Sequence, residues 1–107
     1  MNTVSEENFE DFVKKNRVAV VDFWAPWCMP CKALEPIIEE LEKEMNGVAF
    51  GKVNVDENVP LARKFGIMSI PTILIFLNGE EVDRIIGYVS KEEIKERIAR
   101  YSGNFSP

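Results

Sequence analysis

The sequence predicts one α/β domain in which a central mixed sheet of four to five strands is flanked by helices on both faces. Two runs, Val18–Trp24 and Pro71–Leu77, are almost entirely apolar, as in strands covered on both sides. Val48–Val55 is a further predicted strand. Helical patterns separate these strands, and such alternation indicates crossover connections and a parallel centre of the sheet.

Two helices are expected in the first half of the chain. Ser5 is a suitable N-cap for the first helix, which ends near Asn16. The second helix runs from Cys28 to Met45, with apolar residues at spacings of three and four and with Pro36 inside it. Gly47 then fits the C-terminal end of this helix.

The second half of the chain predicts a short helix and a hairpin. The helix spans Val59–Phe65 and is closed by Gly66. Asn78-Gly79 is a strong signal for a two-residue hairpin turn. Val82–Gly87 is therefore expected to return as an antiparallel strand, which makes the sheet mixed.

The two ends of the domain are defined less sharply. Ser90 and Glu93 form a capping box that begins a final helix through Tyr101. The tail, Ser102–Pro107, is expected to be frayed. The sequence leaves open whether Met1–Val4 adds a short edge strand. We take residues 1–107 as a single domain.

The composition limits the classes of function. The 107 residues include 13 Lys and Arg against 18 Asp and Glu, so this acidic chain is not expected to bind nucleic acid or anionic lipid. Hydrophobic residues make up 46%, which is typical of a soluble globular domain. The sequence has no histidine, which excludes His-based nucleophilic catalysis and His-dominated metal sites.

Targeting signals are not expected either. The N-terminus is polar and acidic, unlike a signal peptide, and no apolar run approaches the ~18–20 residues of a membrane span. We therefore expect a cytoplasmic protein, and a monomer. In a reducing compartment, a lone Cys-x-x-Cys pair is more often catalytic or metal-binding than a permanent crosslink.

The pair Cys28-Met29-Pro30-Cys31 follows a buried strand and begins an amphipathic helix. A spacing of three places both sulfur atoms on one helix face, with Cα atoms within the ~4.4–6.8 Å that a disulfide requires. The free amides at the helix N-terminus favour a thiolate at Cys28. Pro30 suits the first turn, where its missing N–H costs nothing.

This placement supports thiol–disulfide exchange, in which Cys28 attacks a target disulfide and Cys31 then resolves the mixed disulfide. Two alternatives remain. A zinc site would have to recruit two further ligands, and the cysteines could also be structural thiols.

The segment from Val21 to Lys32, containing Trp27-Cys28-Met29-Pro30-Cys31, closely resembles the active-site segment of thioredoxins. Ile70-Pro71-Thr72, Asn78-Gly79-Glu80 and Gly87 fall where that family has its cis-proline loop, hairpin and closing glycine. The resemblance covers about Val4 to Tyr101 and implies the thioredoxin fold. The chain departs from the family at Met29, where glycine is usual. The resemblance implies that the two residues between the cysteines, Met29 and Pro30, tune the redox potential.

The resemblance implies roles for three supporting residues. Asp22 would be a buried general base for Cys31, whereas from the residues alone it could equally be a strand-end carboxylate turned toward water. Lys52 would lie near that carboxyl and temper its pKa, the alternative being a solvated lysine. Pro71 would follow a cis peptide bond and present the backbone of Ile70 to an extended substrate.

The resemblance also implies a substrate surface around Cys28. Its expected members are Trp27, Met29, Ile70, Gly87 and Tyr88. An exposed apolar patch of this kind suits the recognition of many proteins. For Trp27, ordinary core packing is the alternative.

The expected activity is that of a protein disulfide reductase and electron carrier, with no bound cofactor and no metal. Its partners would be disulfide-containing proteins and a flavin-dependent thioredoxin reductase. Two alternatives are a glutaredoxin-like enzyme that uses glutathione and a protein-binding module gated by the state of the disulfide.

Overall fold

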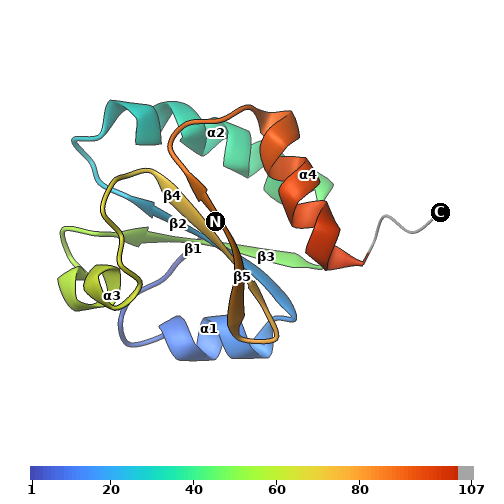
Figure 1. Cartoon of the computed structure of the whole chain (residues 1–107), viewed down its shortest axis with the longest axis horizontal. Coiled ribbons are helices and arrows are strands. Elements are labelled where there is room, and N and C mark those ends of the chain that lie inside the picture. The colour runs from blue at the N-terminus through green and yellow to red at the C-terminus, as the bar shows by residue number, and fades with distance from the viewer. Residues whose placement is uncertain (104–107) are drawn as a thin grey trace.

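The computed structural model describes residues 1–103, which form five strands and four helices (Figure 1). In chain order these elements are β1 (Asn2–Thr3), α1 (Phe9–Lys15), β2 (Val18–Trp24), α2 (Met29–Glu44), β3 (Val48–Asn54), α3 (Val59–Lys64), β4 (Thr72–Leu77), β5 (Glu80–Ile86) and α4 (Lys91–Ser102).

The strands form one mixed sheet in the order β1-β3-β2-β4-β5, which confirms the predicted class. β1, β3 and β2 are parallel, and β5 is antiparallel to β4. The open question of an edge strand is answered by β1, in which Asn2 and Thr3 pair with Gly51 and Lys52 of β3.

The prediction of a parallel centre is only partly right, because β4 runs antiparallel to β2. The chain between β3 and β4, residues 55–71, contains only the six-residue α3. This helix spans about 9 Å at 1.5 Å per residue, against roughly 23 Å for the seven residues of β3. α3 therefore does not run the length of the sheet as a crossover helix does, and the chain enters β4 at the edge where β3 ends.

Helices cover both faces of the sheet, with α1 and α3 on one side and α2 and α4 on the other (Figure 1). Alternation along β2 sends Ala19, Val21 and Phe23 into the core beneath α1 and α3. Val20 packs in the core beneath α2 and α4. Asp22 has the same parity as Val20, so its carboxyl faces α2.

Two predicted caps have different outcomes. Ser90 is confirmed, because its Oγ accepts a hydrogen bond from the Glu93 N–H at 3.1 Å. Ser5 is wrong as the N-cap of α1, which starts only at Phe9 with Asn8 at the cap. Residues 6–8 form a turn there, and the Ser5 N–H donates to Asn8 Oδ1 at 2.8 Å.

The predicted fraying starts too early at Ser102. This residue is the last of α4, and it is buried. Gly103 follows as the C-cap with φ 72°, a left-handed conformation that glycine adopts without steric cost. The remaining predicted tail, 104–107, lies outside the described residues. None of the helices in 1–103 combines the length and hydropathy that crossing a membrane requires.

Candidate active site

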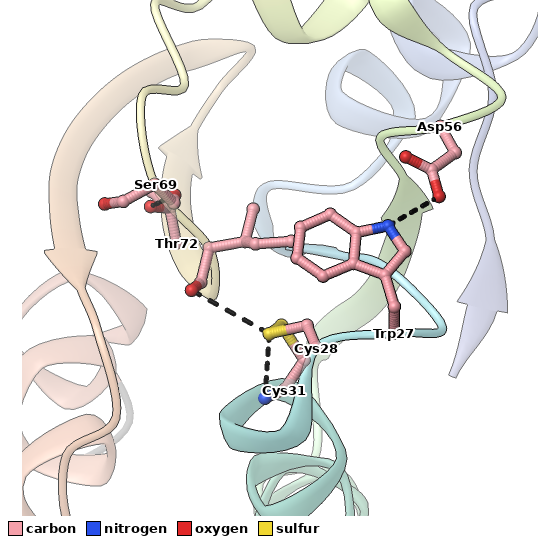
Figure 2. The surroundings of a disulfide bond; sticks show 7 residues. Trp27, Cys28, Cys31, Asp56, Ser69 and Thr72 are labelled. Atoms are coloured by element: carbon pink, nitrogen blue, oxygen red, sulfur yellow. Dashed lines mark hydrogen bonds between the residues drawn. A yellow bond between two sulfur atoms is a disulfide. The ribbon is translucent and has the colours of Figure 1, made fainter.

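Cys28 and Cys31 form a disulfide at the N-terminus of α2 (Figure 2). Their Cα atoms are 5.3 Å apart, within the predicted range. Cys28 is the N-cap residue, and its Sγ accepts a hydrogen bond from the Cys31 N–H at 3.2 Å. The same Sγ lies 3.8 Å from the Ile70 carbonyl oxygen. An amide of the first turn of α2 is thus directed at the Cys28 sulfur, which is the placement that favours a thiolate.

The local sequence explains this placement of the pair. β2 ends at Trp24, and the chain then turns so that the Cys28 N–H donates to the Ala25 carbonyl at 3.1 Å. Pro30 lies exposed in the first turn of α2, where a helix does not use its missing N–H. The two cysteines therefore lie at the beginning of a helix that follows a buried strand after a short turn.

A second loop, between α3 and β4, lies against the cysteines. The Ile70–Pro71 peptide bond is cis, as the resemblance implied, and Pro71 is buried. Thr72 Oγ1 donates to the Ser69 carbonyl at 2.7 Å (Figure 2). The Gly87 N–H donates to the Pro71 carbonyl at 2.8 Å. These bonds fix the loop from both the β4 and the β5 sides.

Asp22 is buried beneath α2, with 3% of its surface exposed. The interpretation of a strand-end aspartate turned toward water is therefore wrong. Its Oδ1 has no hydrogen-bond partner among residues 1–103. Burial, reinforced by repulsion from Glu35, raises the pKa of Asp22 to about 7, and attraction to Lys52 opposes both effects.

Asp22 and Cys31 line one pocket of about 430 Å³, together with Trp24, Pro26, Lys32, Glu35 and Lys52. Lys52 is paired with Asp22 across β2 and β3. Its Nζ lies 3.1 Å from Glu35 Oε2 and 5.1 Å from the centre of the Trp24 ring. Lys52 is therefore not a freely solvated lysine.

Three large side chains of the predicted substrate surface are exposed. Trp27 is 67% exposed, so its interpretation as a core residue is wrong, and Met29 and Tyr88 are exposed as well. The Trp27 indole Nε1 donates to Asp56 Oδ2 at 2.9 Å (Figure 2). Gly87 is partly buried and adjoins Tyr88.

Sequence reasoning missed three residues at this site. Glu35 lines the Asp22 pocket, and its position four residues after Cys31 on a predicted helix was the signal for it. Asp56 accepts the hydrogen bond from Trp27, and no local pattern indicated it because the two residues are 29 positions apart. Met68 is 94% exposed and lines a shallow apolar groove with Trp27.

Comparison with known proteins agrees with this geometry. The Thioredoxin family model matches residues 1–100. The chain belongs to the thioredoxin family. It is 42% identical to thioredoxin of Chlamydia caviae over 102 residues, covering 95% of this chain and 99% of that one. It is 44% identical to thioredoxin of Staphylococcus saprophyticus over 99 residues, covering 92% and 94% of the two chains.

Solved structures show the same fold. A mutant thioredoxin from Halobacterium salinarum superposes with a TM-score of 0.91 at 34% identity, covering 99% of this chain and 93% of that one. The expected thioredoxin fold is thereby confirmed. Family membership and the Cys28–Cys31 pair make the protein a thiol–disulfide oxidoreductase. Thioredoxins in general act on disulfide substrates and are reduced by thioredoxin reductase.

Proposed function

We propose that the protein reduces disulfides in other proteins, with Cys28 as the nucleophile. The observation that carries this assignment is the Cys31 N–H, which donates to Cys28 Sγ at the start of α2. In the reduced protein this amide and the helix dipole would stabilise the Cys28 thiolate. The thiolate attacks one sulfur of the target disulfide, forms a mixed disulfide and expels the other target sulfur as a thiolate, which takes a proton from water.

Cys31 resolves the mixed disulfide, with Asp22 as its general base. Both residues line the same pocket, and a carboxyl whose pKa is about 7 is matched to proton transfer near neutral pH. The Cys31 thiol gives its proton to the Asp22 carboxylate, directly or through water. Its sulfur then bonds to Cys28 Sγ, and the target leaves as a second thiolate. The target disulfide has gained two electrons, and the Cys28–Cys31 dithiol has lost two.

The exposed surface around Cys28 would receive the target. Trp27, Met29 and Tyr88 would supply apolar area beside Gly87, while the backbone of Ile70 would pair with an extended target segment. Pro71 supports this function by placing no N–H donor beside the sulfur atoms.

Partners and location complete the proposal. The protein would carry electrons from a flavin-dependent thioredoxin reductase to its targets in the cytoplasm, as a monomer and without a bound cofactor or metal. The acidic charge of −5 gives no support for nucleic acid or anionic membranes as partners.

Reduction of insulin disulfides with dithiothreitol as electron donor tests the assignment of the cysteines. We expect Cys28→Ser to abolish turnover and to form no adduct. Cys31→Ser should also abolish turnover but accumulate a mixed disulfide with the target, visible by mass spectrometry. A Cys28→Ser protein that trapped the target while Cys31→Ser did not would reverse the two roles.

The choice of electron donor separates the remaining alternatives. We expect turnover with NADPH and thioredoxin reductase and none with glutathione alone. Turnover with glutathione only would support the glutaredoxin-like alternative, although the matched relatives are thioredoxins. Redox-dependent binding without any turnover would support a gated binding module.

A further inference from the structure

Four ionisable groups from three elements line the pocket behind the disulfide. Asp22 enters from β2, Lys52 from the neighbouring position of β3, and Glu35 from α2. Lys32 of α2 lines the same pocket, while β4 contributes the apolar Ile73 opposite Asp22. The pocket thus contains one buried carboxyl, a second carboxyl and two ammonium groups.

Lys52 does not pair with the buried carboxyl beside it. Its Nζ bonds to Glu35 Oε2 at 3.1 Å and lies over the Trp24 ring, 5.1 Å from the ring centre. Asp22 Oδ1, by contrast, has no hydrogen-bond partner within residues 1–103. The lysine is therefore held by Glu35 and Trp24, and within residues 1–103 the buried carboxyl has no direct ion pair.

We infer that Glu35 is a positioning residue of the exchange reaction, holding the Lys52 ammonium in an ion pair of its own so that Asp22 remains free to accept the proton of Cys31. The inference rests on the role of Asp22 in the proposed function and adds a residue to it. Within residues 1–103 the hydrogen bond that Glu35 accepts comes from Lys52 and not from either cysteine, so in this inference it acts through Lys52 and through its own charge.

The chemistry explains why a second carboxylate is needed. A carboxylate with an ammonium bound directly to it loses basicity, because its charged form is stabilised. Asp22 would then be ionised well below neutral pH and would be a poor acceptor for a thiol proton. The Glu35 charge opposes this loss of basicity at Asp22 in two ways. It pairs with Lys52, and it repels the charged form of Asp22.

The test is a titration of the Asp22 carboxyl carbon by NMR in the oxidised protein. Glu35→Gln removes the charge while keeping the shape, and we expect the Asp22 midpoint to fall by roughly one pH unit. Lys52→Gln should move the midpoint in the opposite direction. Glu39→Gln is the matched control, because Glu39 is exposed one turn further along α2 and does not line the pocket. A midpoint in Glu35→Gln equal to that of Glu39→Gln would overturn the inference.

The pH profile of kcat/KM for disulfide reduction provides the functional readout. The acid limb reports the ionisation that activity requires, so Glu35→Gln should shift this limb to lower pH together with the NMR midpoint. In an Asp22→Asn background, Glu35→Gln should leave the profile unchanged. If Asp22→Asn alone had a wild-type profile, the assignment of Asp22 as a base would fail, while the titration would still decide whether Glu35 acts on Asp22.

Discussion

Two aspartates on two strands of one sheet have opposite electrostatic environments. Asp22 of β2 is buried with no hydrogen bond to its Oδ1 in the described chain, and its pKa rises to about 7, chiefly because of burial. Asp83 of β5 accepts hydrogen bonds from Arg97 at 2.6 and 2.8 Å and from the Arg84 N–H at 2.7 Å. These bonds, led by those from Arg97, lower the pKa of Asp83 to about 2.

The difference separates the carboxyl that we propose as the general base from a carboxyl that stabilises the fold. A bidentate arginine compensates the charge of Asp83 and ties β5 to α4, which stabilises the fold. Asp22 receives no such compensation, so its ionised form destabilises the folded protein. This cost falls in the pocket that Asp22 shares with Cys31, where the proposed function requires a proton acceptor.

The largest expected effect is on stability at Asp22. Between the unfolded value of 3.8 and the folded value of about 7, the folded state binds the proton more tightly, so stability falls as pH rises. About three pKa units at roughly 1.4 kcal/mol each give a loss on the order of 4 kcal/mol above pH 7. Asp22→Asn should abolish this loss in the oxidised protein, as measured by guanidinium unfolding at pH 4 and pH 8.

The two pH values provide the internal control for that measurement. At pH 4 the folded protein holds Asp22 neutral, so wild type and Asp22→Asn should have similar free energies of unfolding. At pH 8 the variant should be the more stable of the two. Equal stability at both values would show that Asp22 carries no unfavourable charge, and the contrast with Asp83 would disappear.

A smaller effect of opposite sign is expected at Asp83. Asp83→Asn leaves the largely buried Arg97 without its charged partner and should destabilise the protein by about 1–2 kcal/mol at pH 7. Because the folded pKa is depressed, the stabilisation is present above pH 4 and is lost as pH falls toward 2. Unfolding curves across this acid range measure the effect. Disulfide reduction should keep its wild-type rate, since Asp83 is outside the active-site pocket.

The smallest effect belongs to a third aspartate, Asp11 of α1, which pairs with Lys15 at 3.4 Å on the surface. Both side chains are mostly exposed, so water and salt screen the pair. Asp11→Asn should stay within about 0.5 kcal/mol of wild type in thermal unfolding at pH 7. A loss as large as that of Asp83→Asn would show that pairing alone, without burial, explains the contribution of Asp83.

The fold and the reacting atoms could be predicted from local patterns. Cys28 and Cys31 are three residues apart at a helix start, so their geometry depends on the backbone of one turn, and the same holds for the Ser90 cap. The direction of β4 could not be predicted from local patterns, because it depends on the path of residues 55–71 between β3 and β4. The position of Ser102 at the buried end of α4 likewise depends on packing rather than on its neighbours in sequence.

The sequence by itself determined the class of fold, the reactive pair and the absence of histidine chemistry, because these follow from periodicity, spacing and composition. Only the tertiary structure decided which way Asp22 faces, which carboxylate holds Lys52, and that Trp27 lies outside the core. Each of these depends on groups between 17 and 30 positions apart in the chain, such as Glu35 and Lys52. Burial and charge act through space, so only the folded arrangement of β2, β3 and α2 sets them.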